Sequence, residues 1–311
     1  MLAYVAAPDA PNGLARREAS EPEPGPGDVL VRVTAFSLNR GEIGHIRSLP
    51  PGTVMGWDVA GVVERPAADG SGPAAGQRVF GWSPARGSWA EYVAVPAATL
   101  AVLPDEVSME SGSCLGVASL TALYALRRGG SVLGRRVLVT GAAGGVGRVA
   151  VQLASMSGAE VEAVVGRDPS RVEAVRSLGL PRVTIVDALT PAGPQAHLIL
   201  ESVGGDSLSA AFERVAPGGV IVTYGRSSAR EGSVPTGFFS TGAQLHGLSF
   251  ARDMEGDQIR PAGLETLATL VAQDRLDPGI SHRADWADLH GAIDALMDRA
   301  VAGKAVLQVG G

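Results

Sequence analysis

The 311-residue sequence contains a single cysteine, Cys114, and this scarcity limits the chemistry open to the protein. One thiol excludes an intramolecular disulfide bond and any metal cluster built on several thiolates. No window holds the roughly 18 uninterrupted apolar residues that a membrane-spanning helix needs. The N-terminus, Met1-Leu-Ala-Tyr-Val, reads as a β-strand and lacks the basic segment that begins a signal peptide. We therefore expect a reducing, cytoplasmic setting.

Basic residues are also fewer than acidic ones: the sequence has 26 Lys and Arg and 32 Asp and Glu, which gives a net charge of −6. Nucleic acids and anionic membranes attract proteins through basic stripes, so neither is expected as the main partner. The length and the 45% apolar content suit two modest globular domains, each able to bury a core. The 42 glycines and 20 prolines fall between apolar runs and indicate many tight turns.

The chain up to about Pro104 has the pattern of short strands separated by turns. Segments rich in Pro and Gly, at residues 22–28 and 67–73, stand between apolar runs. This part is therefore predicted to be a β-rich domain. The strands expected in it are Val29–Ala35, Val59–Val63 and Trp89–Val95.

From about Ser108 the apolar period changes, and a helical stretch through Ala118–Leu126 leads into alternating strands and helices. This alternation predicts an α/β domain with a doubly wound parallel sheet. The expected strands are Arg136–Thr140, Val161–Val165, Val183–Val186, Ala196–Leu200 and Val220–Tyr224. The expected helices are Gly147–Ser157, Ser170–Leu178 and Ser207–Val215.

After about Asp253 the pattern predicts two helices, near Ala262–Gln273 and Trp286–Ala302, and a final strand, Ala305–Val309. No β-α-β partner for this strand is evident nearby in the sequence. We therefore expect it to pair with a strand of the first domain.

A glycine-rich turn follows the first strand of the α/β region, in the segment Val137-Leu-Val-Thr-Gly-Ala-Ala-Gly-Gly-Val-Gly147. A dinucleotide pyrophosphate binds backbone N–H groups at a helix N-terminus and tolerates nothing bulky in between. The spacing is G-x-x-G-x-x-G, and a tight turn without a ligand is the alternative. The apolar strand before it and the amphipathic helix after it favour dinucleotide binding. The residues predicted to bind are Gly141, Gly144, Gly145, Val146 and Gly147.

The residues after the next strand indicate which dinucleotide binds. NAD-selective sites usually place an acidic residue there, on the ribose 2′-hydroxyl. Here the strand ends with Gly166 and Arg167, and Arg171 follows one helical turn later. Two guanidinium groups beside a glycine suit a 2′-phosphate, through charge-assisted hydrogen bonds. NADP(H) is therefore predicted over NAD(H), although Asp168 lies close by and either arginine could instead be a solvated surface residue.

Segments along nearly the whole chain match the motifs of one family. They are Ser37–Glu42, Met55–Val63, Gly76–Phe80, Gly87–Tyr92, Leu120–Leu123, the glycine turn, Glu201–Gly205, Gly218–Gly225 and Gly303–Leu307. With them the sequence resembles the zinc-independent quinone oxidoreductases and enoyl reductases of the medium-chain dehydrogenase/reductase superfamily. The resemblance implies a GroES-like β-barrel domain, residues 1–115 and 255–311, with a Rossmann NADP-binding domain, residues 116–254, inserted between them. It also implies a homodimer.

The resemblance also bears on zinc. Zinc-dependent members carry a cysteine near positions 38–39, a histidine at 57 and a further ligand near 114–121. This chain has Leu38, Asn39 and Trp57 there, and Cys114 stands alone, so four-ligand zinc geometry is not expected. Without a Lewis acid, alcohol oxidation loses the group that polarises the oxygen. Hydride addition to an activated C=C bond or a quinone does not need it, which makes an unsaturated carbonyl or a quinone the expected substrate.

The resemblance further implies roles for single residues. Asn39 matches a position near the nicotinamide ribose or the substrate, and Thr121 one close to the nicotinamide. Lys304 matches a position near the cofactor phosphates. A loop-stabilising asparagine, a threonine bonded to its own helix and a solvated lysine are the respective alternatives. Further residues expected to line the cofactor are Val203, Gly204, Gly225, Arg226, Ser227 and Phe250. The aromatic candidates for the walls of an apolar pocket are Trp57, Trp89, Tyr92, Phe239 and Phe250.

The proton donor is the point where the sequence departs from the family. Several similar enoyl reductases have a tyrosine a few residues beyond the Asn39 motif, but residues 43–50 contain none. His45 could donate a proton, or it is an exposed loop residue, and Glu42 could orient Asn39. Water is the remaining donor. A biosynthetic tailoring reductase or reductive cyclase on a polyketide-like substrate stays open, as does a non-catalytic NADPH-binding sensor or structural protein.

Overall fold

The computed structural model describes residues 1–249 and 261–310 and divides them into two compact units. The first unit comprises residues 1–120 and the C-terminal residues 261–310, and the second comprises residues 121–249. Phe250, a candidate for the cofactor site, lies outside the described residues. None of the described helices combines the length and the apolar character needed to span a membrane.

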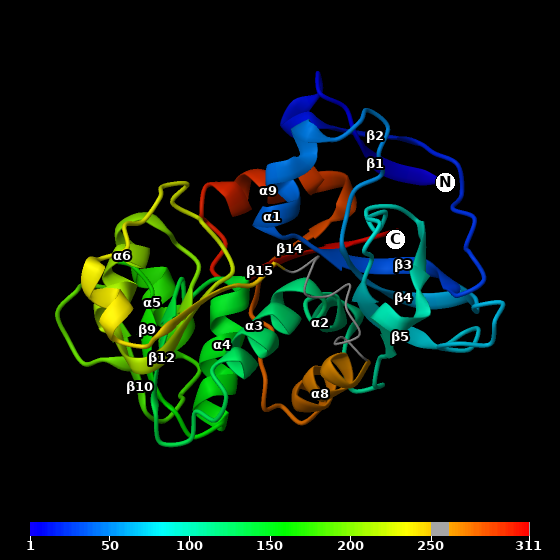
Figure 1. The fold of residues 1–311 in the computed structure, drawn as a ribbon. Coiled ribbons are helices and arrows are strands. Elements are labelled where there is room, and N and C mark those ends of the chain that lie inside the picture. The colour runs from blue at the N-terminus through cyan, green and yellow to red at the C-terminus, as the bar shows by residue number, and fades with distance from the viewer. Residues whose placement is uncertain (250–260, 311) are drawn as a thin grey trace. The chain divides into compact units, whose positions relative to one another are not determined.

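The first unit consists mainly of β-strands (Figure 1). Its strands are β1 (Leu2–Ala6), β2 (Leu14–Glu18), β3 (Asp28–Ser37), β4 (Asp58–Arg65), β5 (Arg78–Trp82), β6 (Tyr92–Pro96), β7 (Leu100–Val102), β14 (Ile280–Asp285) and β15 (Lys304–Gln308). Its helices are α1 (Arg40–His45), α2 (Met109–Ser113), α8 (Pro261–Ala272) and α9 (Leu289–Met297), with 3₁₀ turns η1 (Pro11–Gly13), η2 (Ile46–Ser48), η3 (Ala97–Thr99) and η5 (Trp286–Asp288).

Strand β3 is the centre of this unit, because it pairs antiparallel with β4, β6 and β15. The seven-stranded sheet runs β14-β15-β3-β4-β5-β7, with β6 joined to β3, and β1 and β2 form a separate hairpin. Alternate residues of β3 point into one hydrophobic core, where Phe36 stacks on Trp89 with ring centroids 5.8 Å apart. Trp89 is completely buried there, so it is a core residue and not a pocket wall.

The C-terminal strand pairs with the first unit as the sequence predicted, since β15 lies antiparallel beside β3 (Figure 1). The expectation that it lacks a β-α-β partner was wrong, because β14 runs parallel to β15 and α9 connects them. Strand β14 alternates half-buried with exposed residues, including Arg283 and Asp285. A strand with so few apolar side chains gives almost no periodic signal in the sequence.

The helix predicted over Trp286–Ala302 is shorter in the structure. It divides into the turn η5 and the helix α9, and Arg299 beyond it has a left-handed φ of 64°. Trp286 is buried, and its carbonyl oxygen accepts a hydrogen bond of 2.9 Å from the hydroxyl of Tyr4. This bond joins the first strand of the chain to its C-terminal segment.

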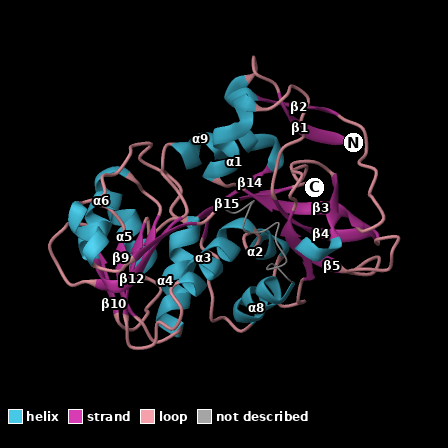
Figure 2. Ribbon diagram, viewed as in Figure 1, coloured by secondary structure: helices cyan, strands magenta, loops and turns pink. Residues whose placement is uncertain are grey.

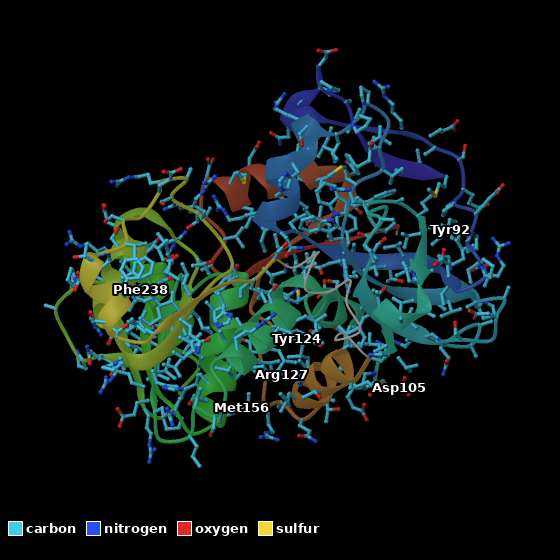
Figure 3. The ribbon with its side chains drawn as sticks, viewed as in Figure 1. Tyr92, Asp105, Tyr124, Arg127, Met156 and Phe238 are labelled. Atoms are coloured by element: carbon cyan, nitrogen blue, oxygen red, sulfur yellow. The ribbon has the colours of Figure 1, made fainter. Side chains whose placement is uncertain are left out.

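The second unit has strands β8 (Arg136–Thr140), β9 (Glu160–Val164), β10 (Val183–Val186), β11 (Ala196–Glu201), β12 (Val215–Thr223) and β13 (Gln244–Gly247). Its helices are α4 (Gly145–Met156), α5 (Pro169–Arg176) and α6 (Gly205–Arg214), with the turn η4 (Thr236–Ser240), and α3 (Val117–Arg128) leads into it. Arg127 of α3 covers the ring of Tyr124 at 5.3 Å (Figure 3).

All six strands are parallel, in the order β10-β9-β8-β11-β12-β13. Figure 2 shows strands β9, β10 and β12 in magenta and helices α4, α5 and α6 in cyan in this unit. The chain runs outward from β8 to β10, crosses back to β11 and then runs outward to β13. This confirms the predicted doubly wound sheet and places its switch point between β8 and β11. Strand β12 begins at Val215 and not at Val220, and the short, polar edge strand β13 was not predicted.

Candidate functional site

The N-terminus of α4 lies at the switch point, directly after β8 and the glycine turn. Among the described residues no side chain caps this helix, whose N-cap is the exposed Gly144. The first amides of a helix have no partner within the helix and carry a partial positive charge. An anion placed here would meet the N–H groups of Gly145, Val146 and Gly147, which are the ligands predicted from the sequence.

The neighbouring helices of the same sheet begin differently. The side chain of Asp168 caps α5 by accepting a 2.9 Å hydrogen bond from the amide of Ser170. The turn before α6 is held by the buried carboxyl group of Glu201, which accepts from the amides of Val203 and Gly204. Asp168 thus occupies the N-terminus of α5, while Gly204 at the N-cap of α6 has no side-chain cap and only the turn before it is held by Glu201.

The glycine turn has no room for side chains. A Cβ atom on Gly147 would lie 2.2 Å from the carbonyl oxygen of Gly141 and 2.7 Å from the Cα atom of Ala142. Gly141 itself has a left-handed φ of 61°, which glycine adopts without strain. The strand, the turn and the helix can therefore approach one another only because these positions are glycine.

The two arginines predicted to select a 2′-phosphate follow the end of β9, as expected from the chain order. The guanidinium of Arg167 is 90% exposed and lies 3.9 Å from the carboxylate of Asp187, while that of Arg171 lies 3.6 Å from Asp168. Gly166 between strand and arginine has a φ of 84°. An exposed ion pair such as that of Arg167 contributes little energy, so the Arg167 guanidinium can turn to a phosphate, whereas the side chain of Arg171 is 25% exposed.

Backbone hydrogen bonds bring the turn after β11 together with the loop after β12. The amides of Ser227 and Ser228 donate to the carbonyls of Ser202 and Val203, at 3.0 and 2.9 Å. The predicted cofactor residues Val203, Gly225, Arg226 and Ser227 therefore lie at one end of the sheet. Further along the loop, Phe238 packs against Phe212 of α6 with ring centroids 4.8 Å apart (Figure 3).

Tyr224, between β12 and this loop, was not singled out from the sequence. Its amide donates to the carbonyl of Glu201 at 3.0 Å, and burial raises the pKa of its phenol above the ordinary value of 10. The sequence prediction looked for a tyrosine only near the Asn39 motif of the first unit, whereas Tyr224 belongs to the second unit.

A second group of polar side chains lies in the first unit and is called the Asn39 cluster here: Asn39, Glu42, Asp58 and Lys304. Asp58 is completely buried at the start of β4. Its carboxylate accepts from the Asn39 amide nitrogen at 2.8 Å and from the Lys304 ammonium at 3.2 Å. Ser37 and the backbone amide of Val117 donate to it as well. Asp58 was not among the residues predicted from the sequence, because only its neighbour Trp57 stands at a position where zinc-dependent relatives have a ligand.

Lys304 is the only lysine in the sequence, and it is 2% exposed. Its ammonium donates to the carbonyl of Leu38, to Asn39 Oδ1 and to Asp58 Oδ2, at 2.9, 2.7 and 3.2 Å. Three acceptors satisfy all three of its N–H groups. The structure therefore does not support the alternative of a solvated lysine.

Glu42 is the fourth member of the cluster and is 1% exposed. Its Oε1 atom accepts from the backbone and side-chain nitrogens of Asn39, at 2.8 and 3.1 Å, and Oε2 accepts from the amide of Trp57. The contact with Asn39 that the sequence suggested is thus present. Burial, and then the nearby Asp58, raise the pKa of Glu42 from 4.5 to about 8, against the opposing effect of Lys304 and the hydrogen bonds of Asn39.

The other two candidate catalytic residues are His45 and Thr121. His45 is the last residue of α1 and is exposed, while Thr121 is buried in α3. Of the aromatic candidates, Phe239 is 81% exposed, and Tyr92 and Trp57 are half-buried. The structure thus gives Asn39 a set of buried polar partners.

Two family models match the chain. One, described as an alcohol dehydrogenase GroES-like domain, covers residues 25–105, and the other, described as a zinc-binding dehydrogenase, covers residues 181–307. Among solved structures, an alcohol dehydrogenase superfamily protein from Novosphingobium aromaticivorans is 27% identical with a TM-score of 0.87, covering 100% of both chains. The chain belongs to the medium-chain dehydrogenase/reductase superfamily.

The curated relatives that the chain matches are longer than it, so the chain spans only part of their length. It is 33% identical to the rat synaptic vesicle membrane protein VAT-1 homolog over 229 residues, which are 69% of this chain and 56% of that protein. A pikromycin polyketide synthase component from Streptomyces venezuelae is 34% identical over 227 residues, 69% of this chain but 6% of that protein. The quinone oxidoreductase of Escherichia coli, solved with NADPH, shares the fold at 22% identity and a TM-score of 0.87, with 99% and 100% of the two chains covered.

The description of the second family model mentions zinc, so the donor atoms of the described residues bear on this metal. The part of the chain that the structure describes contains no group of three His, Cys, Asp or Glu side chains able to hold a metal. Cys114 is buried with its sulfur against the Glu110 carbonyl, and burial raises the pKa of its thiol to about 12. Asp58 is already paired with Lys304. These residues do not fit a zinc ion.

Proposed function

We propose that the protein is an NADPH-dependent, zinc-independent oxidoreductase that reduces a C=C bond conjugated to a carbonyl group, or a quinone. The observation that carries this proposal is the open N-terminus of α4 at the switch point of the parallel sheet. Dinucleotides bind at such crevices, with the pyrophosphate on the helix N-terminus. A nicotinamide bound by the same unit supplies a hydride ion.

The second unit offers donors for each anionic part of NADPH. The amides of Gly145, Val146 and Gly147 would bind the pyrophosphate, and the guanidinium groups of Arg167 and Arg171 would bind the 2′-phosphate. The residues that would line the rest of the dinucleotide are Val203, Gly225, Arg226 and Ser227. Phosphate recognition by two arginines is the feature that would distinguish NADPH from NADH.

The substrate class follows from the donor set of the first unit. Since its side chains do not fit a zinc ion, the substrate must delocalise the charge that hydride addition creates. In an α,β-unsaturated carbonyl compound, the β-carbon accepts the hydride and the carbonyl oxygen takes the negative charge. A proton from solvent then adds to the α-carbon. In a quinone, one hydride and one proton from solvent together convert both carbonyl oxygens to hydroxyl groups.

The polyketide synthase relatives favour a second candidate substrate. Matches to synthase components of Streptomyces and of Mycobacterium tuberculosis, at 31–34% identity, suggest an enoyl thioester or another polyketide-like intermediate. A tailoring reductase or a reductive cyclase would use the same cofactor site. Such an enzyme would reduce enoyl thioesters and leave simple quinones unchanged, whereas a non-catalytic sensor would bind NADPH without oxidising it.

Cofactor selection is tested by measuring the dissociation constants of NADPH and NADH by calorimetry. Replacing both Arg167 and Arg171 with alanine should weaken NADPH binding by at least about 100-fold, because two lost charge-assisted hydrogen bonds at about 1.5–3 kcal/mol each amount to about 3–6 kcal/mol. NADH affinity should stay the same. Arg176→Ala is the matched control, since this exposed arginine of α5 pairs with Glu173 and should have no effect on either cofactor.

Equal affinity of the unmodified protein for NADPH and NADH would contradict the arginine assignment. We also expect a homodimer, which light scattering on the purified protein measures directly. A screen of NADPH consumption with quinones, enones and enoyl thioesters separates the two candidate substrate classes.

A further inference from the structure

The ladder between the two central strands of the parallel sheet ends earlier than the ladders on either side of it. Strand β8 pairs with β9 as far as Thr140, and β11 pairs with β12 as far as Glu201. The central strands β8 and β11 pair with each other as far as Val139 and Leu200, one residue less. Their backbones thus stop pairing just before the glycine turn, at the switch point of the sheet.

Two side chains continue the contact where this ladder ends, and Thr140 and Ser202 are called the β8–β11 bridge here. The amide of Ser202 donates to Oγ1 of Thr140 at 2.9 Å, and Oγ of Ser202 donates to the carbonyl of Thr140 at 3.1 Å. The buried Thr140 hydroxyl directs its own hydrogen to the Glu201 carboxylate and the Leu200 carbonyl, at 3.3 and 3.4 Å. A lone pair of the same oxygen is therefore left for the Ser202 amide.

The β8–β11 bridge contacts two segments of the predicted cofactor site. Thr140 directly precedes Gly141, and a Cβ atom on Gly141 would lie 2.7 Å from Oγ of Ser202. The carbonyl of Ser202 accepts a 3.0 Å hydrogen bond from the amide of Ser227. The bridge thus joins the glycine turn to the loop after β12, and all of these residues belong to the second unit.

We propose that Thr140 and Ser202 are positioning residues, which hold the glycine turn in place for the pyrophosphate of a dinucleotide. This inference rests on the proposed function, which supplies the dinucleotide. Helix amides bind an anion only while their N–H groups point at its oxygens, so a shifted turn weakens several hydrogen bonds together. NADPH and NADH share the pyrophosphate and differ in the 2′-phosphate. The bridge therefore affects both cofactors alike.

Thr140→Val tests the bridge, because valine has nearly the shape of threonine but no hydroxyl group. The Kd values of NADPH and NADH, measured by calorimetry, should both rise about tenfold, and their ratio should stay unchanged. Thr140→Ser keeps Oγ1 as Oγ and should restore both values. A rise for NADPH alone would place the effect at the 2′-phosphate and overturn the proposal.

Thermal unfolding separates positioning from a loss of stability. Calorimetry well below the Tm measures binding to the folded protein, so a lower Tm by itself leaves the Kd values unchanged. A lower Tm of Thr140→Val with both Kd values unchanged would make the bridge purely structural and would overturn the proposal. Thr184→Val is the matched control, since Thr184 lies exposed on β10 of the same sheet and should leave both values unchanged.

A double-mutant cycle tests whether the two residues act as one bridge. Ser202→Ala removes Oγ but leaves its amide bonded to Thr140, so it should raise both Kd values by less, about threefold. The double variant with Thr140→Val should show a rise smaller than the product of the two single effects, because the two residues are in contact. A rise equal to that product would show that they act separately and would overturn the bridge.

The unmodified protein separates this inference from the proposed function. If it does not bind NADPH, the proposed function fails. If it binds NADPH and Thr140→Val binds NADPH and NADH equally well, the proposed function stands and the positioning role of the bridge is overturned.

Discussion

At the scale of single residues, charge balance in the Asn39 cluster decides which groups are ionised. Glu42 and Asp58 both contact one amide, and Lys304 is the cation bonded to Asp58 in the described part of the chain. A buried carboxylate with an ammonium partner keeps its charge more easily than one without. Glu42 has no such ion pair with Lys304, and burial raises its pKa.

The raised pKa of Glu42 predicts a specific pH dependence of stability. Its pKa is about 8 in the folded protein and near 4.5 when unfolded, so between these values the folded state binds more protons. The free energy of unfolding should then fall as the pH rises through this window. Glu42→Gln should remove that part of the fall, as urea unfolding at about pH 5 and about pH 9 measures. Identical pH profiles for the two proteins would contradict the assignment, and Glu64→Gln, at an exposed acid, is the control.

The residues of the Asn39 cluster differ in how well the sequence predicted their contacts. Asn39 and Glu42 lie within one short motif, and their spacing suggested the contact that the structure contains. Lys304 is 246 residues away from Asp58, so no local pattern could predict their ion pair. The resemblance placed Lys304 near a cofactor phosphate, a role that no observation tests.

At the scale of elements, the close approach of the glycine turn to α4 has a mutational consequence. Gly147→Ala would place a Cβ atom 2.2 Å from the carbonyl oxygen of Gly141, which is backbone and cannot rotate away. The turn must shift, at a cost of roughly 1–3 kcal/mol. Thermal unfolding should show a lower Tm, and calorimetry a weaker affinity for NADPH. Gly237→Ala in η4 is the control, since no atom lies within 4 Å of its Cβ position. An unchanged NADPH affinity in Gly147→Ala would argue against this turn as the pyrophosphate site.

The elements that the sequence predicted best are those with continuous apolar runs. Strands β8 and β10 have the predicted bounds, because fully or half-buried parallel strands are rich in β-branched residues. Strands β13 and β14 were not predicted, because they lack continuous apolar runs. Each presents polar side chains on at least one face and depends on its neighbour in the sheet for its structure.

At the scale of the whole molecule, the first unit depends on both ends of the chain. Leu307 of β15 is completely buried in the same core as Phe36 of β3. Leu307→Ala should therefore lower the free energy of unfolding by about 2–5 kcal/mol, measured with urea. Val102→Ala, at a residue that is 47% exposed, should change it by less than about 0.5 kcal/mol. Equal effects of the two substitutions would contradict the shared core.

The sequence predicted the two-unit organisation and the superfamily because motifs of this family lie along nearly the whole chain. The sequence did not identify the substrate, since no single motif encodes an apolar substrate pocket. Trp89, a candidate for its wall, packs into the core, and Phe239 is exposed. The side chains that surround a substrate come from separate segments, and their selection depends on tertiary structure.

The central claim is hydride transfer from NADPH without zinc. The most direct measurement follows the loss of NADPH absorbance with a panel of quinones, enones and enoyl thioesters, on protein whose metal content has been determined. We predict turnover with at least one of these acceptors, faster with NADPH than with NADH and unchanged by a chelator. Stoichiometric zinc in the purified protein, or no NADPH oxidation with any acceptor, would contradict the account.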